Sequence, residues 1–111
     1  MQNKELSFKE KVIDVVKSIP RGKVLNYGSV AAISGSPRAS RQVGSILTGI
    51  SGENREVPWW RVVNKAGYLS IRGKLYDAKE LQMKLLIDEG VEVSKDYYID
   101  MRKYKMNVNF S

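Results

Sequence analysis

The 111-residue sequence contains no cysteine and no histidine. Zinc sites built from these residues are therefore excluded, and so are disulfides and catalysis by Cys-His or Ser-His-Asp arrangements. No apolar run approaches the roughly 20 residues that a membrane span requires, so we expect no membrane association. The first ten residues are polar and lack the apolar core of a signal peptide, so we expect no export. We also expect no metal and no cofactor.

Acidic residues are absent from a long internal stretch. Asp14 is followed by no further acid until Glu53, and the basic residues between them are Lys17, Arg21, Lys23, Arg38 and Arg41. The whole chain has 19 Lys and Arg against 12 Asp and Glu, which gives a net charge of +7. Such a stretch suits contact with phosphates, whose binding gains from counterion release. A soluble basic surface with no nucleic-acid partner is the alternative that charge alone leaves open.

The length and composition predict one globular domain over residues 1–111, with a core over 7–94 and a basic tail over 95–111. Ser7 and Glu10 form a capping box at the start of a first helix. Pro20 and Gly22 end this helix and turn the chain. Its apolar residues recur at helical spacing, which indicates one buried face: Phe8, Val12, Val15, Val16 and Ile19.

Two short helices are predicted next. Asn26 is a good N-cap for a helix over residues 27–34, and Gly35 stops that helix. Ser36 as cap and Pro37 at the first position predict the start of a third helix, which carries Arg41. Two short helices joined by a tight turn that contains glycine are typical of a helix-turn-helix.

The second half is predicted to contain a β-hairpin and a long helix. Residues 61–63 and 68–71 are the expected strands of the hairpin, with its turn at residues 65–67. Asp77 is the expected cap of the last helix, with Glu80 completing a capping box and with a buried stripe at Leu81, Leu85 and Leu86. The fold class is therefore a mostly helical α+β domain, a winged-helix-like helix-turn-helix with a small β-hairpin. The tail could form a strand or a helical turn, or be mobile.

Three features are candidates for chemistry. Trp59 and Trp60 offer a large flat surface that could stack on a base or fill the core. Tyr27, at the start of the second helix, could touch a phosphate or simply pack. Arg41, on the third helix, could contact bases or enter the base stack, or lie on a solvated helix face.

Four segments together resemble the DNA-binding domain of the O6-alkylguanine-DNA alkyltransferases. They are NYGSVA at residues 26–31, SRQVG at 40–44, VPWWRVV at 57–63 and LLIDEGV at 85–91. In the transferases the third segment reads Pro-Cys-His-Arg-Val, where the cysteine accepts the alkyl group and the histidine, with a distal glutamate, activates it. Trp59 and Trp60 stand at those two positions here. The resemblance therefore implies a fold that has lost its nucleophile and is not an enzyme.

Tryptophan at the cysteine position marks the alkyltransferase-like subfamily, which binds alkylated DNA without repairing it. Residues 64–73 and 99–104 also resemble that subfamily, whereas Trp60 departs from its usual His or Gln. Glu89 corresponds to the distal glutamate and is expected to have no partner to polarise. Trp59, Trp60 and Glu89 are thus read as a degenerate former active site. Arg61 is expected to be a structural ion-pair partner that holds the motif turn.

The resemblance also implies roles for individual residues. Arg41 would replace an extruded guanine in the stack, and Tyr27 would crowd the target phosphate and favour its rotation. Ala39, Ser40 and Gly44 would let the third helix approach a minor groove. The base pocket would be formed by Trp59, Leu47, Val62 and Arg72, the last of these placed over the flipped base as a cation.

The implied function is non-catalytic sensing of O6-alkylguanine in duplex DNA by base flipping, which flags the lesion for nucleotide excision repair proteins. We expect a monomer, located in the cytoplasm with the nucleoid of a prokaryote or in the nucleus of a eukaryote. A winged-helix regulator without lesion specificity is the alternative. A base glycosylase that uses Glu89 is a further alternative.

Overall fold

The computed structural model describes residues 7–51, 56–71 and 78–108. The first helix, α1 (Phe8–Lys17), begins at the predicted capping box, because the Ser7 hydroxyl accepts from the Glu10 N–H and the Glu10 carboxylate accepts from the Ser7 N–H. Asn26 caps α2 (Tyr27–Ile33), and its side chain accepts from the Ser29 N–H at 2.7 Å. Both predicted caps are therefore confirmed.

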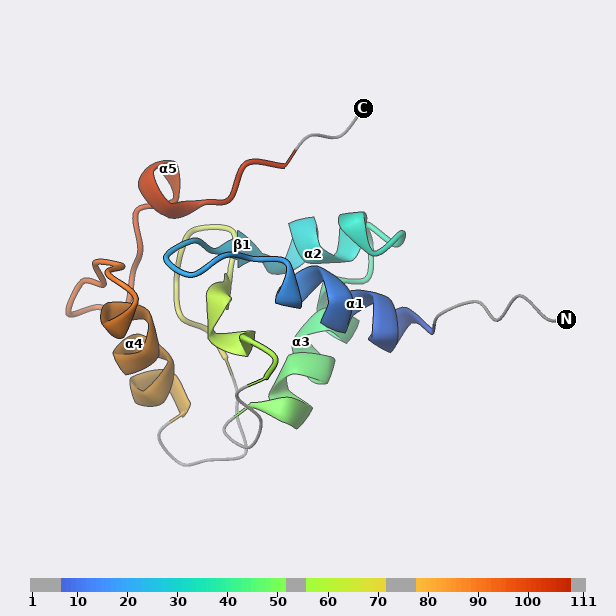
Figure 1. Ribbon diagram of the computed structural model, residues 1–111, viewed down its shortest axis with the longest axis horizontal. Coiled ribbons are helices and arrows are strands. Elements are labelled where there is room, and N and C mark those ends of the chain that lie inside the picture. The colour runs from blue at the N-terminus through green and yellow to red at the C-terminus, as the bar shows by residue number, and fades with distance from the viewer. Residues whose placement is uncertain (1–6, 52–55, 72–77, 109–111) are drawn as a thin grey trace, which may run out of the picture.

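Helix α3 (Ser40–Ile50) starts later than the sequence predicted. Residues 36–39 form a turn instead of a first helical turn, and the Ala39 N–H donates to the Ser36 carbonyl at 2.9 Å. Ser36 is therefore not the N-cap. Helices α1, α2 and α3 pack against one another as a three-helix unit, with α2 and α3 as the helix-turn-helix (Figure 1).

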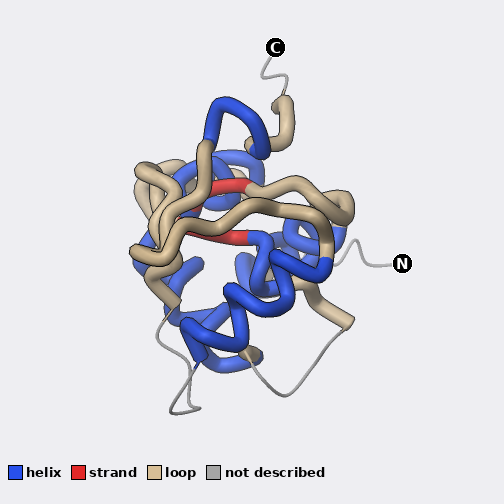
Figure 2. Tube along the Cα trace, turned by 90° about the vertical axis from the view of Figure 1, so that its left-hand side faces the viewer, coloured by secondary structure: helices blue, strands red, loops and turns tan. Residues whose placement is uncertain are grey.

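The predicted β-hairpin is wrong, although the short sheet itself exists. Strand β2 (Val62–Val63) pairs in parallel with β1 (Leu25–Asn26), so the sheet joins the two halves of the chain (Figure 2). The physical reason lies at Asn64, whose side-chain oxygen accepts from the N–H groups of Ala66 and Tyr68. This compact turn directs residues 67–69 away from β2 and onto the tail, where Tyr68 bridges antiparallel to Tyr98.

Helix α4 (Ala78–Asp88) packs against the 3-10 helix η1 (Trp59–Arg61) and lies away from α1 in Figure 1. Of its predicted stripe, Leu86 is fully buried, whereas Leu81 and Leu85 are only half-buried. Gln82 takes a fully buried position that the sequence pattern did not predict. The predicted cap at Asp77 lies outside the described residues.

The tail forms part of the domain. Helix α5 (Met101–Tyr104) is capped by Asp100, and the Val24 N–H donates to the Tyr104 carbonyl at 3.0 Å. Ile99 and Tyr104 are buried with the core, which therefore extends beyond residue 94. Among the described residues, none of the helices has the length and apolarity needed to cross a membrane.

Candidate nucleic-acid interface

An open groove of about 820 Å³ lies between the helix-turn-helix and the segment that follows β2. Seven residues line it: Tyr27, Ser40, Arg41, Gly44, Ser45, Thr48 and Ser70. Arg41 is the charged residue among these described lining residues. The structure thus brings together Tyr27, Ser40, Arg41 and Gly44, each of which the sequence analysis predicted to contact DNA.

Three lining residues were not predicted. Ser45 and Thr48 follow Arg41 at intervals of four and seven residues, so helical spacing could have found them. Ser70 belongs to a segment that is distant in the sequence from α2 and α3, and no local sequence pattern predicts that it lines the groove. Its position there depends on the tertiary fold.

Helix α3 presents two different faces. Val43 and Leu47 are fully buried against the core, whereas Arg41 and Ser45 are exposed. This division follows from the 3.6-residue helical period and leaves the small polar residues of α3 at the groove. Ala39 is buried at the N-cap of α3 and lines a second, smaller hollow with Arg38.

Tyr27 forms one wall of the groove and packs against α3. A Cβ built at Gly44 would lie 4.0 Å from Cε1 of Tyr27, so the tyrosine ring lies close to the helix where α3 has no side chain. Burial raises the pKa of Tyr27, and a hydrogen bond with the Ser70 side chain offsets part of that rise. The phenol is therefore protonated at neutral pH and able to donate to an oxygen.

The expected pocket residues Trp59, Leu47 and Val62 are all fully buried. They are not among the residues that line the open groove. The indole Nε1 of Trp59 is buried and has no hydrogen-bond partner among the described residues. Its ring meets that of Trp60 edge to face, with 5.8 Å between the ring centroids. Arg72 lies outside the described residues.

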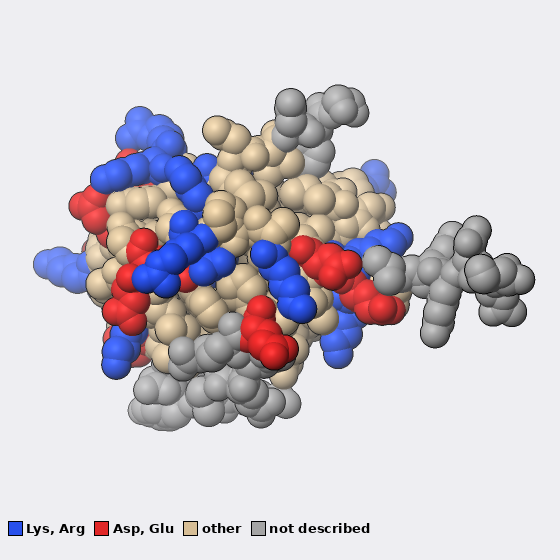
Figure 3. Space-filling view, viewed as in Figure 1, with Lys and Arg blue, Asp and Glu red and all other residues tan. Residues whose placement is uncertain are grey.

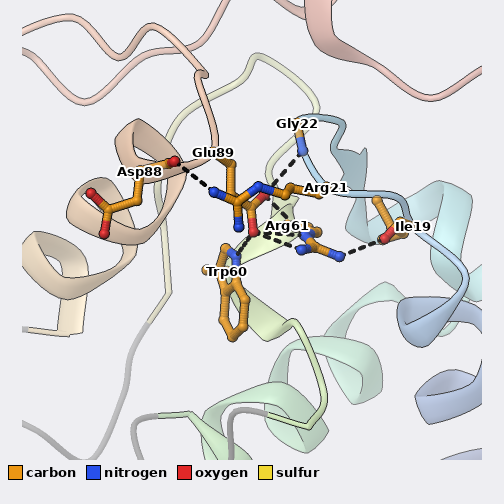
Figure 4. A network of polar contacts seen from close by, with 7 residues as sticks. All are labelled: Ile19, Arg21, Gly22, Trp60, Arg61, Asp88 and Glu89. Carbon is orange, nitrogen blue, oxygen red and sulfur yellow. Dashed lines mark hydrogen bonds and ion pairs between the residues drawn. The ribbon is translucent and has the colours of Figure 1, made fainter.

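Glu89 is the centre of a polar network that joins α4, η1 and the turn after α1 (Figure 4). Its carboxylate accepts from Trp60 Nε1 at 2.8 Å, from Arg61 Nη2 at 2.7 Å and from the Gly22 N–H at 3.1 Å. Arg61 also donates to the Ile19 carbonyl at 2.7 Å. Glu89 therefore accepts hydrogen bonds from structural donors that the sequence did not identify, and none of them is a histidine that it could polarise. The structural role predicted for Arg61 is confirmed.

The charge state of Glu89 follows from these contacts. Burial acts to raise the pKa of Glu89, but hydrogen bonds from Arg61, Trp60 and Gly22 together with the Arg61 charge outweigh it. The net effect places its pKa below the ordinary value. Glu89 is therefore an ionised structural anchor, with Trp60 bound to it where the transferase motif has a histidine.

Basic and acidic side chains are interspersed on the molecular face shown in Figure 3. In the described part of the chain, His, Cys, Asp and Glu residues form no group of three that could hold a metal ion. The arrangement of the groove itself, with one arginine, one phenol and several hydroxyls, suits hydrogen bonding to phosphates and to a base.

Residues 7–91 match the family described as 6-O-methylguanine DNA methyltransferase, DNA binding domain. The chain is 43% identical over 104 residues to the DNA base-flipping protein of Escherichia coli, a match that covers 94% of this chain and 78% of the other. It is 39% identical over 101 residues to alkyltransferase-like protein 1 of Schizosaccharomyces pombe, with 91% and 89% of the two chains covered. The structure also resembles the crystal structure of S. pombe Atl1 in complex with damaged DNA containing O6-carboxymethylguanine. That comparison has a TM-score of 0.80 at 35% identity and covers 91% of this chain and 95% of the other.

Proposed function

Because this chain belongs to the 6-O-methylguanine DNA methyltransferase DNA-binding domain family, in its alkyltransferase-like branch, we propose that it senses O6-alkylguanine in duplex DNA without catalysis. The observation that carries this proposal is the groove, where Arg41 of α3 and Tyr27 of α2 lie beside an open space in a chain that has no cysteine. These two side chains could hold an extruded base and its phosphate, whereas alkyl transfer needs a thiolate.

Arg41 is the residue that we expect to fill the vacated base stack. It is exposed on α3 at the mouth of the groove, and its guanidinium can stack on bases while it neutralises nearby phosphates. Extruding a base costs a few kcal/mol, and this cost is smallest for a poorly paired base. An O6-alkylated guanine pairs badly, so the lesion itself favours its own extrusion.

Tyr27 and the small residues of α3 would shape the approach to the duplex. The protonated phenol of Tyr27 would crowd and contact the target phosphate and favour rotation of the nucleotide. Ser40 and Gly44 at the groove, with Ala39 at the start of α3, would let the helix lie close to the floor of a minor groove. Trp59, Leu47 and Val62 are fully buried. We propose that they form the layer beneath the extruded base once DNA is bound, with Arg72 over it.

The cellular setting follows from this ligand. We propose that the bound lesion is flagged for nucleotide excision repair proteins, because a complex without covalent chemistry leaves the damage in place. The protein would act as a monomer where chromosomal DNA lies, in the cytoplasm of a prokaryote or the nucleus of a eukaryote.

The test is a titration of two duplexes that differ only at one guanine, which is unmodified in one and O6-methylated in the other. The wild-type protein should bind the methylated duplex more tightly at the same salt concentration. Arg41→Ala should remove most of this preference. The matched control is Arg38→Ala, which removes the same charge near the start of α3 but outside the groove, and it should weaken both complexes equally. Equal wild-type binding to the two duplexes would favour a winged-helix regulator without lesion specificity.

A further inference from the structure

A further hollow, the tail hollow, lies between the first turn of α2 and the segment that begins with α5. Its volume is about 310 Å³, and Figure 1 shows the chain running from α5 past β1 toward α2. Seven residues line it: Ser29, Met101, Arg102, Lys105, Met106, Asn107 and Val108. This lining contains two cations, a hydroxyl and an amide but no carboxylate, which is a composition suited to an anion such as phosphate.

The backbone of the tail is fixed at this place. The Val24 N–H donates to the Tyr104 carbonyl at 3.0 Å, and the Met106 N–H donates to the Val24 carbonyl at 2.8 Å. Lys105 is therefore paired in parallel with Val24, three residues before Tyr27. Because these hydrogen bonds set the register, the basic side chains of the tail are held beside the start of α2.

The two cations of the tail hollow are available to a ligand. The Lys105 side chain has no hydrogen bond or ion pair within the described part of the chain. Arg102 Nε lies 3.6 Å from Asp100 Oδ1, and these side chains are 95% and 53% exposed, so their pairing contributes little. Lys103 differs from both, because its Nζ lies 2.5 Å from a carboxylate oxygen of Glu92. Its charge is thus already paired.

The tail hollow and the groove lie on two sides of the first turn of α2. Tyr27 lines the groove and Ser29 lines the hollow. Successive residues of a helix are rotated by about 100°, so side chains two positions apart point to nearly opposite sides. A helix is only about 10 Å wide, and each DNA strand carries one phosphate per about 3.4 Å of helix axis. A strand that passes Tyr27 can therefore bring a second phosphate to the hollow.

We propose that the tail hollow is a second phosphate site, in which Lys105 and Arg102 bind the DNA backbone a few nucleotides from the extruded base and on the same strand. This inference rests on the proposed function, which places the target phosphate at Tyr27. A phosphate contact carries no sequence information, so the site adds affinity for any duplex and leaves the preference for the lesion unchanged.

The first experiment measures binding of Lys105→Gln to the O6-methylguanine duplex and to the unmodified duplex over a range of salt concentrations. At low salt, both complexes should weaken by the same factor, about threefold to tenfold. The slope of log K against log salt should become shallower by about one, because one fewer phosphate is neutralised. Combining Lys105→Gln with Arg102→Gln should change the slope by about two.

Lys103→Gln is the matched control, because it removes the same charge from the same short segment but at a side chain that pairs with Glu92 outside the tail hollow. Its salt slope should stay nearly that of the wild-type protein. Equal changes of slope in Lys103→Gln and Lys105→Gln would show that the tail acts only through its overall charge, and the inference would be wrong.

The second experiment locates the phosphate. A neutral methylphosphonate replaces one phosphate at a time along the strand that carries O6-methylguanine, and each duplex is titrated with wild-type protein and Lys105→Gln. At one flanking position the neutral linkage should weaken wild-type binding and abolish the further effect of Lys105→Gln. Additive losses at every position would mean that Lys105 contacts no phosphate of that strand and would overturn the inference.

A free anion is distinguished from the DNA backbone by titration with inorganic phosphate, followed through the NMR signals of the tail amides. No saturable binding is expected at concentrations where duplex binding is complete, and a saturable site would assign the hollow to a free anion instead. Equal wild-type binding to the two duplexes would overturn the proposed function, whereas the salt slope of Lys105→Gln on the unmodified duplex would still decide whether the tail contacts DNA.

Discussion

At the scale of single residues, Trp60 and Glu89 explain how the turn of the transferase-like motif stays folded although its cysteine and histidine are absent. The indole N–H of Trp60 donates to a carboxylate that also pairs with Arg61, and the side chains of Arg61 and Glu89 are only 14% and 4% exposed. The sequence suggested the structural role of Arg61 but not its partner, because Glu89 lies 28 residues further along the chain.

Glu89→Gln should destabilise the fold by about 3–5 kcal/mol at neutral pH, since it leaves the largely buried Arg61 without a countercharge. The pKa of Glu89 is lowered in the folded state, so its stabilisation is present above the unfolded value of about 4.3 and is lost as pH falls through the folded pKa. The free energy of unfolding, measured in urea between pH 3 and 7, should therefore fall less in acid for Glu89→Gln than for the wild-type protein. Glu92→Gln, at an exposed ion pair with Lys103, should leave the curve nearly unchanged.

Trp59→Cys should not restore alkyl transfer. The new thiol would be buried, where its pKa rises, and Glu89 remains bound to Trp60 and Arg61 with no histidine to relay a proton. Mass spectrometry after incubation with an O6-methylguanine duplex should find the protein unmodified. A mass increase of one methyl group on Cys at this position would contradict the argument.

At the scale of elements, the sequence predicted where helices begin better than it predicted which segments pair with each other. The caps at Ser7 and Asn26 act within a few residues of the chain, and both are present. The register of β2 depends on β1, a strand 37 residues earlier, so a pattern that fits a hairpin could not reveal the parallel pairing. The placement of Ser70 escaped prediction for the same reason.

Gly67 is the point where the turn after β2 meets the tail. Its φ is +90°, and a Cβ there would lie 2.3 Å from the Ile99 carbonyl oxygen. Gly67→Ala should destabilise the protein by about 3 kcal/mol, through backbone strain and displacement of residues 97–99. Gly35→Ala is the matched control, with a φ of +96° and no heavy atom within 4 Å, and it should lose only about 1 kcal/mol. Similar losses in denaturant unfolding of the two variants would show that the contact with Ile99 has no energetic weight.

At the scale of the whole molecule, the helix-turn-helix and the motif half are joined by a short sheet, and the groove lies where their surfaces meet. The sequence indicated the fold class and four of the residues of α2 and α3 that line this groove, namely Tyr27, Ser40, Arg41 and Gly44. The sequence predicted that Trp59, Leu47 and Val62 line the base pocket, but in the structure all three side chains are fully buried in the core. The order of residues along the chain cannot show whether a side chain lines a pocket or lies beneath the pocket's surface, because this depends on how the core is assembled.

The net charge of +7 predicts that affinity for any duplex falls steeply with salt. The preference for the lesion should change little, because both complexes release a similar number of counterions. Titrations of the two duplexes at four salt concentrations should therefore give parallel lines in a plot of log K against log salt. Lines that converge as the salt concentration rises would mean that the preference itself is electrostatic.

The central claim is that a damaged guanine is swung out of the helix and held without any covalent bond. The most direct measurement places 2-aminopurine beside an O6-methylguanine and follows its fluorescence as protein is added, with the oligonucleotide recovered afterwards for mass analysis. We predict a fluorescence rise that reverses with competitor DNA, a smaller rise with Arg41→Ala, and a methyl group still on the recovered guanine. No rise on saturating binding, or a guanine that has lost its methyl group, would contradict the account.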